Sequence, residues 1–281
     1  MVVSDSSLRG VSSAGELLPY KQAVVGSNPS PPKNQGCPQG TLFYFSKVEV
    51  TVMDNFLIRL EKILYEIEEA KSKANRKDHI KLMAITKTHP KEVIEKAYDA
   101  GQFLFGENRV QEIEEKFPLS KSGYQLHMVG HLQSNKVKKI IALVDSIDSI
   151  DSVKVLKLIN REALQNDLVM PVLFQYKISD EALKGGFTTE IEYYKALEIA
   201  SDLKGVSVKG VMGIAPFSSN EKIVRNSFSI LRELRDQSKI RFPNLDFQTL
   251  SMGMSLDFKW AIEEGSTLVR IGSSLFGERE K

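Results

Sequence analysis

The sequence predicts an α/β protein built as a single TIM-type (β/α)8 barrel preceded by an N-terminal helix. Eight short apolar segments alternate with segments of helical periodicity between residues 53 and 281. Strict alternation is typical of parallel sheets with right-handed crossovers, and eight units in about 200 residues fit one compact barrel. A doubly wound open sheet would show the same alternation. No G-x-G-x-x-G follows the first strand, however, which disfavours a dinucleotide-binding fold.

The elements follow from spacing and from helix-end signals. A long first helix is predicted over Met53–Ala74, because apolar residues recur there at helical spacing with charges between them. The next helix starts at Pro90, a favoured first residue, and closes at Gly101. The eight predicted strands are Ile80–Ile85, Phe103–Phe105, Gln125–Val129, Leu143–Ile147, Val172–Tyr176, Val208–Met212, Asp246–Leu250 and Thr267–Ile271. The other predicted helices are Arg109–Phe117, Lys136–Ala142, Ser152–Gln165, Glu190–Leu203, Glu221–Asp236 and Asp257–Glu264.

Residues 1–52 differ in composition from the rest of the chain. They hold half of the 10 prolines and the only cysteine, Cys37, and they show no sustained periodicity. Such a segment buries too little apolar surface to offset its ordering entropy, so we expect a disordered extension. A start codon assigned too early would give the same pattern, since Met53 opens the first regular segment. A signal or transit peptide does not fit, and a Pro-rich ligand segment is a weaker alternative.

Composition excludes several functional classes. The chain has 38 basic and 36 acidic residues and a net charge of +2, which argues against bulk nucleic-acid binding. No apolar run approaches the ~18 residues of a membrane span. One cysteine makes no internal disulfide and fits a reducing, cytoplasmic compartment. The four histidines are scattered, and the one pair four residues apart spans a predicted strand and its loop, so no metal site is expected.

Lys87 is the most informative polar residue at a strand end. It directly follows the first predicted strand, and binding groups in these barrels lie at the C-terminal ends of the strands. An ordinary lysine at this rim would extend into solvent. A lysine in a low-dielectric rim instead loses its proton more readily, and the neutral amine can form a Schiff base with an aldehyde.

Two small-residue segments follow the last two predicted strands, Ser251-Met-Gly-Met-Ser255 and Gly272-Ser273-Ser274. Many barrels bind a phosphate at this corner, through backbone N–H groups and the N-terminus of a short helix. Each segment alone could be an ordinary turn or helix cap. Both together with Lys87 on the first strand favour a phosphorylated aldehyde, and pyridoxal 5′-phosphate (PLP) meets both requirements.

Five motifs in order carry a family resemblance. They are Ala84-Ile-Thr-Lys87-Thr-His-Pro90, Phe105-Gly-Glu-Asn108-Arg-Val-Gln-Glu112, His127-Met-Val-Gly-His131-Leu-Gln-Ser-Asn-Lys136, Leu250-Ser-Met-Gly-Met-Ser255, and Val269-Arg-Ile-Gly272 followed by Phe276-Gly277. Together they resemble the YggS/PROSC family of pyridoxal phosphate homeostasis proteins, over Met53–Arg279. Residues 1–52 lie outside the resemblance.

The resemblance implies a fold like the N-terminal domain of alanine racemase and a role for each matched residue. Lys87 would carry PLP as a Schiff base. Asn108 would lie near the cofactor and His131 at the rim. Arg270 would lie close to the pyridine ring or the phosphate. The phosphate would be surrounded by Ser251, Gly253, Gly272 and Ser273, with Ser255 in the same segment.

The predicted function is intracellular PLP homeostasis, as a carrier or regulator with little or no catalysis. An arginine at the pyridine nitrogen would weaken the electron sink on which PLP enzymes depend. We also expect residues 53–281 to form the PLP-binding barrel and to leave no room for the second domain that racemases of this fold use. The expected partners are PLP and PLP-dependent apoenzymes, without nucleic acid or membrane, and the expected state is a cytoplasmic monomer.

Two other functions stay open at this point. One is a single-domain PLP-dependent amino-acid racemase that uses Lys87 and a second base such as His131. The other is a Schiff-base aldolase without a cofactor.

Overall fold

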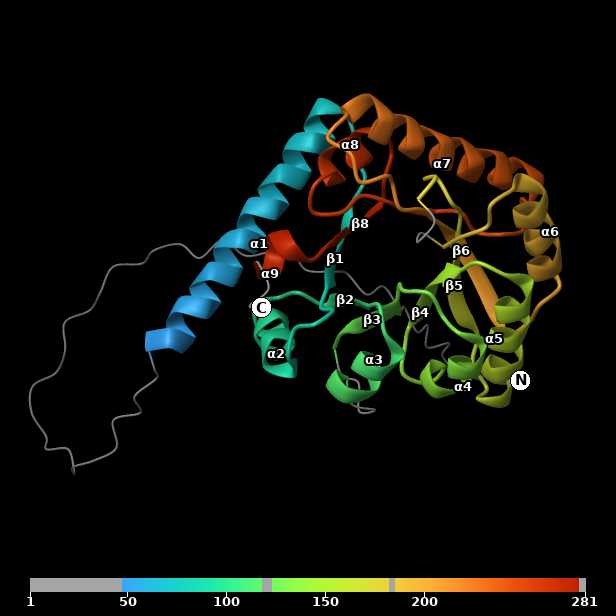
Figure 1. The fold of residues 1–281 in the computed structure, drawn as a ribbon, viewed down its shortest axis with the longest axis horizontal. Helices are drawn as coiled ribbons and strands as arrows, with labels where there is room; N and C mark the ends of the chain where they lie inside the picture. The colour runs from blue at the N-terminus through green and yellow to red at the C-terminus, as the bar shows by residue number, and fades with distance from the viewer. Residues whose placement is uncertain (1–46, 118–122, 182–184, 278–281) are drawn as a thin grey trace, which may run out of the picture. The chain divides into compact units, whose positions relative to one another are not determined.

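Eight parallel strands pair in sequence order and close into a barrel, which confirms the predicted fold class (Figure 1). The computed structural model describes residues 47–117, 123–181 and 185–277, with side chains from Asn55 onward. The strands are β1 (Lys81–Ile85), β2 (Leu104–Glu107), β3 (Gln125–Met128), β4 (Ser146–Ile150), β5 (Met170–Gln175), β6 (Val206–Met212), β7 (Thr249–Ser251) and β8 (Leu268–Ile271). All eight predicted strands overlap these elements.

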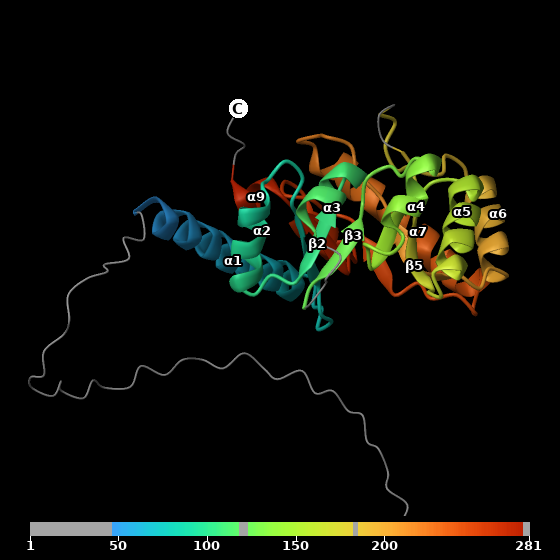
Figure 2. The same ribbon diagram turned by 90° about the horizontal axis from the view of Figure 1, so that it is seen from below.

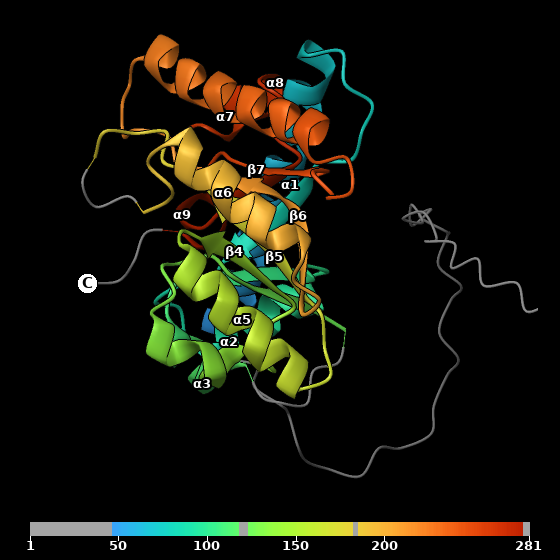
Figure 3. The same cartoon turned by 90° about the vertical axis from the view of Figure 1, so that its right-hand side faces the viewer.

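The helices surround the barrel on its outer side (Figures 1 and 2). They are α1 (Lys47–Lys73), α2 (Lys91–Asp99), α3 (Val110–Lys116), α4 (Val137–Ile140, after a 3-10 turn over Ser134–Lys136), α5 (Val153–Gln165), α6 (Glu190–Ser201), α7 (Glu221–Arg241), α8 (Phe258–Glu263) and α9 (Ser273–Phe276). Figure 3 shows α5, α6 and α7 side by side over the strands. Each of these three helices begins at a side chain that caps a backbone N–H, namely Ser152, Thr189 and Asn220.

Two apolar layers fill the fold. The larger lies between the strands and the helices, and the smaller lies in the barrel lumen, where Met83, Ile85, Val129 and Leu268 pack together. Gly106 faces this lumen, because a Cβ there would come within 2.6 Å of Met83 Sδ. Side chains alternate along a strand, so Lys87 continues the lumen-facing series of Met83 and Ile85, while Thr86 faces the helices.

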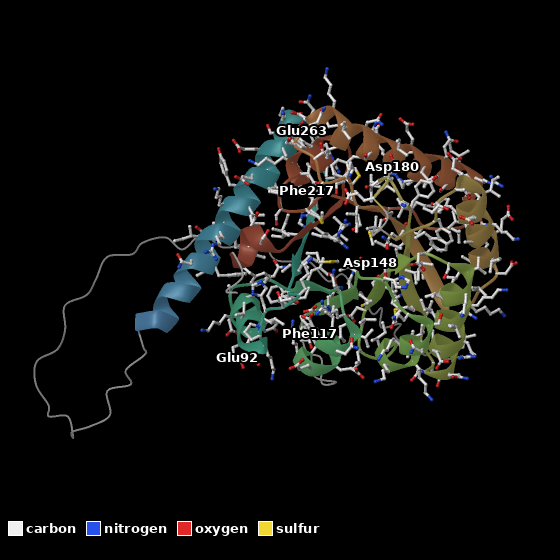
Figure 4. All side chains as sticks on the ribbon, viewed as in Figure 1. Glu92, Phe117, Asp148, Asp180, Phe217 and Glu263 are labelled. Carbon is white, nitrogen blue, oxygen red and sulfur yellow. The ribbon has the colours of Figure 1, made fainter. Side chains whose placement is uncertain are left out.

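Helix α1 packs against α8 and α9 through one apolar stripe, made up of Phe56, Leu60, Ile63, Ile67 and Ala70. Ion pairs frame the contact: Glu263 of α8, labelled in Figure 4, pairs with Lys73 of α1 at 2.8 Å and with Arg225 of α7. Because α9 has only four residues, α1 supplies the apolar cover on this side of the barrel.

Several predicted boundaries were wrong: α7 ends at Arg241, five residues after its predicted end, and β7 begins at Thr249, three residues after its predicted start. Helix α1 begins at Lys47, six residues before the predicted start, so residues 47–52 are helical rather than part of an irregular extension. The remainder of the predicted extension, residues 1–46, lies outside the described residues. Strand β4 lies three residues later than predicted: Leu143 and Val144 close the last turn of α4 through hydrogen bonds to Ile140 O. Their burial beside that helix made the apolar run look like a strand.

Truncation of the α1 stripe should destabilise the fold, because Ile63 is 3% exposed. We expect Ile63→Ala to lower the free energy of unfolding by about 2–5 kcal/mol in urea titrations. Ile58, on the same helix but 62% exposed, is the matched control, and Ile58→Ala should stay within about 0.5 kcal/mol of wild type. Equal effects of the two changes would contradict the docking of α1 through this stripe.

Candidate functional site

A cavity of about 1450 Å³ opens at the C-terminal end of the barrel, where the predicted site residues were expected. Six of those residues line it: Lys87, Asn108, Ser255, Arg270, Gly272 and Ser273. The structure thus brings together residues from the ends of β1, β2, β7 and β8. The cavity also contains Ile85 and Val129 of the lumen cluster, so its floor is apolar.

Lys87 lies at the point where β1 ends and its chain turns outward. It is half-buried and lines the cavity directly above Ile85 on the lumen side of the strand. The next residue, Thr88, has a φ of 66°, a left-handed conformation that is unusual for a β-branched residue. The lysine therefore stands at a sharp and specifically held turn rather than on a regular strand.

Arg270 is the buried cation of the cavity. Its backbone pairs with Met83 of β1, and its guanidinium donates to Ser251 Oγ at 2.5 Å and to Gly213 O at 2.8 Å. Burial lowers the Arg270 pKa to about 10, against the opposing effect of Asp148 and Asp257. The group therefore stays charged at neutral pH.

Asp148 supplies the negative charge of the lumen and stands near the centre of the barrel in Figure 4. It is fully buried on β4, where its carboxylate accepts from Ser146 Oγ at 2.6 Å and lies 2.9 Å from His127 Nδ1. The predicted fourth strand ended at Ile147, whereas β4 extends to Ile150 and includes Asp148 and Ser149. A polar lumen of this kind breaks the apolar pattern by which the strand was predicted.

The segments after β7 and β8 form one corner. Ser274 N donates to Ser255 Oγ at 3.2 Å, and Arg270 N donates to Gly253 O at 3.0 Å. Gly272 precedes the short helix α9, and a Cβ there would lie 3.3 Å from Ile85 O, a tight contact. Ser255, Gly272 and Ser273 line the cavity wall at this corner, which we call the small-residue recess.

Two of the expected phosphate residues stand behind this recess. Ser251 is fully buried and holds Arg270. Gly253 has a φ of +95°, and a Cβ there would approach Ala261 Cβ at 2.6 Å and Phe258 Cα at 2.9 Å. Gly253 thus lets β7 lie close to α8, and neither residue lines the cavity.

His131 lies in a neighbouring hollow of about 590 Å³, which Asn108 and Lys136 also line. Its Nδ1 is 2.7 Å from Asp151 Oδ2, and its side chain is largely exposed. Asn108 lines both spaces, but His131 does not line the main cavity.

Part of the cavity wall lies outside the residues predicted for the site. The loop after β6, from Ile214 to Ser219, and Trp260 of α8 line the cavity, and Phe217 at the rim is 84% exposed (Figure 4). Glu181 holds this loop by accepting the Phe217 N–H at 2.8 Å. Apolar residues in a loop carry no periodic signal, so only their position after a strand could have identified them.

In the part of the chain that the structure describes, no group of three or more His, Cys, Asp or Glu side chains is placed to hold a metal ion. No helix among the described residues combines the length and the apolar character that crossing a bilayer requires.

Comparison with known proteins identifies the family. The family model "Alanine racemase, N-terminal domain" matches residues 58–280. A pyridoxal phosphate homeostasis protein of Aquifex aeolicus is 42% identical over 225 residues, which cover 79% of this chain and 97% of the relative. The chain belongs to the family of pyridoxal phosphate homeostasis proteins.

Solved structures agree with this family. PipY of Synechococcus elongatus, solved with PLP bound, aligns with a TM-score of 0.69 and 31% identity, covering 79% of this chain and all of PipY. An alanine racemase of Clostridium difficile aligns with a TM-score of 0.61 and 14% identity, over 81% of this chain and 57% of the racemase. At that identity the racemase shows the barrel fold alone.

Loss of the Arg270 guanidinium should destabilise the barrel even without a ligand. Arg270→Gln removes the buried cation that faces Asp148 and weakens the link from β8 to β7 and to Gly213. We expect the free energy of unfolding to fall by about 2–4 kcal/mol in denaturant titrations. Arg241, an exposed arginine on α7 paired with Glu198, is the control. A loss for Arg270→Gln no larger than for Arg241→Gln would contradict the structural role.

Proposed function

We propose that this protein binds PLP through Lys87 and acts in PLP homeostasis as a carrier or regulator, with little or no catalysis of its own. The observation that carries the proposal is the gathering of Lys87, Arg270 and the Gly272–Ser273 recess around one cavity. Similarity to pyridoxal phosphate homeostasis proteins, and to PipY with PLP bound, supports it.

The residues of the cavity fit PLP. The volume of about 1450 Å³ exceeds that of a typical small-molecule site. Lys87 offers a primary amine for the aldehyde, and the recess formed by Ser255, Gly272 and Ser273 offers hydroxyl and N–H donors for the phosphate. When bound, PLP supplies an aldehyde that bonds covalently to amines and a ring that withdraws electrons from them.

The Arg270 guanidinium favours holding PLP over catalysing a reaction on it. A guanidinium donates hydrogen bonds and accepts none, so a ring nitrogen beside Arg270 would accept a hydrogen bond and stay unprotonated. Asp148 is engaged with Ser146 and His127 in the lumen. Lys87 thus shares its cavity with the buried cation Arg270.

The racemase alternative is less well supported. It requires a second acid/base group on the face of PLP opposite Lys87. His131, the residue considered for this role, lies in the neighbouring hollow with its ring bonded to Asp151. His89, Glu181 and Asp257 do line the cavity, so racemisation has to be tested directly.

We further propose that residues 53–281 are the PLP-binding unit, that PLP-dependent apoenzymes receive the cofactor, and that the protein works as a cytoplasmic monomer. The single cysteine of the chain is in keeping with a reducing compartment. Light scattering on the purified full chain tests the monomer, and transfer of bound PLP to an apo-aminotransferase tests delivery. A dimer mass, or no transfer to an apoenzyme that accepts free PLP, would contradict these two points.

Removal of the Lys87 amine should abolish covalent PLP binding. Lys87→Ala should lack the absorption band near the visible edge and, after borohydride reduction, should show no PLP adduct by intact mass. Lys136→Ala, which removes a lysine from the neighbouring hollow, should keep both. An adduct retained by Lys87→Ala would show that another lysine holds the aldehyde. Wild-type protein that cleaves aldols without bound PLP would favour the cofactor-free aldolase.

The PLP-loaded protein should not racemise amino acids at enzymatic rates. Incubation with L-alanine and other L-amino acids, followed by chiral chromatography, should show turnover far below the ~1–10³ s⁻¹ of ordinary enzymes. Turnover within that range would favour the racemase function. The residues to test would then be His89, Glu181 and Asp257.

A further inference from the structure

A buried charged cluster lies behind Lys87, on the helix side of the barrel wall. We call it the Glu–Lys–Glu cluster: Glu107 at the end of β2, with Glu112 and Lys116 of α3. Figure 2 shows α3 over the strands β2 and β3, and Figure 4 labels Phe117, which follows Lys116 at the end of this helix. Lys116 shares the buried face of α3 with Val110 and Ile113.

The cluster binds both peptide groups that flank Lys87. Lys116 Nζ donates to Thr86 O, the carbonyl that precedes Lys87, at 3.0 Å. Glu112 Oε2 accepts from the N–H of Thr88, which follows Lys87, at 2.7 Å. Lys116 Nζ and Glu112 Oε2 lie 2.5 Å apart, so the two residues that bind the backbone on either side of Lys87 form an ion pair with each other.

Glu107 extends the same restraint to the side chain of Thr86. Its Oε1 accepts from Thr86 Oγ1 at 2.6 Å and from Lys116 Nζ at 3.1 Å. Thr86 is fully buried and faces outward. Because side chains alternate along the chain, holding Thr86 outward directs Lys87 into the cavity.

The turn that the cluster holds is strained. Thr88 has a φ of 66°, which costs a β-branched residue of order 1–3 kcal/mol and persists only where its surroundings fix it. The carboxylate of Glu112 on its N–H is such a restraint. Among the described residues, the other non-glycine residues with positive φ are Asn75 and Asp167, types that tolerate this conformation.

Burial makes the cluster energetically significant. The Lys116 and Glu107 side chains are 8% and 0% exposed. Burial opposes the charge of Glu112, but hydrogen bonds from Lys116 and Thr88 outweigh it and hold its pKa below the usual value. Burial raises the pKa of Glu107 despite its contacts with Thr86 and Lys116, and its Oε2 has no hydrogen-bond partner. Removing Lys116 would leave these carboxylates without their shared cation.

We propose that Glu107, Glu112 and Lys116 are positioning residues for Lys87, which hold its backbone so that its amine meets the PLP aldehyde in a reactive orientation. The inference rests on the proposed function of Lys87. The bond-forming step joins Lys87 Nζ to the aldehyde carbon. The neutral amine gives up two hydrogens and the aldehyde its oxygen, and these leave as one water.

The test separates the covalent step from the rest of binding. Apo-protein is mixed with PLP, and the rate constant for the imine absorption band is measured by stopped flow. In parallel, equilibrium binding of pyridoxine 5′-phosphate is measured, because this analogue has the ring and phosphate but no aldehyde. We expect Lys116→Met to form the imine about tenfold more slowly, with unchanged affinity for the analogue.

Matched variants separate positioning from general destabilisation. Ile159→Ala removes a fully buried side chain from α5, away from β1, and should leave both readouts at wild-type values. Glu112→Leu should slow imine formation as Lys116→Met does. Glu112→Gln keeps a carbonyl oxygen for the Thr88 N–H and should restore much of the rate. If Lys116→Met does not fold, the comparison of Glu112→Leu with Glu112→Gln shows whether the cluster positions Lys87.

The failure of this inference is distinguishable from the failure of the proposed function. Wild-type protein that forms no imine would overturn the proposed function itself. Wild-type protein that forms it, together with folded variants that form it at the same rate, would overturn only the positioning role. A parallel loss of imine formation and analogue affinity in the variants would also overturn it, because the cluster would then support the cavity in general.

Discussion

Pairing of β8 with β1 closes the barrel, and the composition of the site follows from that closure. The register sets Met83 beside Arg270 and Ala84 beside Ile271. The first and last strands of the barrel therefore end side by side, and Lys87 faces the same cavity as Gly272 and Ser273. An open sheet with the same sequential strand order would leave these segments at opposite edges. Closure of the barrel thus places the Lys87 amine, the Arg270 guanidinium and the small-residue recess around one cavity.

Buried charged residues hold particular side chains and backbone groups in place on both sides of the barrel wall, the lumen side and the helix side. On the lumen side, Arg270 is held by Ser251 and Gly213 and faces Asp148. On the helix side, Lys116 joins two glutamates to the backbone around Lys87. Buried ion pairs such as those of Lys116 need not add stability over apolar packing. Lys87 lies on the barrel wall between these two groups of charges and faces the cavity.

The sequence was sufficient to predict the barrel, and with it the position of Lys87 and of the corner after β7 and β8 at one end of the strands, because these depend on local pattern and strand order. The prediction from sequence failed where a buried residue is polar or charged. Asp148 is a fully buried acid within β4, and an apolar criterion ended the strand before it. Lys116 sits on the buried face of α3, where spacing from Val110 and Ile113 could have shown it. His131, Ser251 and Gly253 match family motifs, but motif membership does not distinguish a residue that lines a cavity from one that supports the wall.

Peptide mapping of the borohydride-reduced, PLP-loaded full chain tests the central claim most directly, because reduction fixes the aldehyde carbon to the amine that held it. The account predicts one pyridoxyl-modified peptide, with the modification on Lys87. Modification of Lys136, Lys177 or another lysine in place of Lys87, or a loaded protein that carries no modification after reduction, would contradict it.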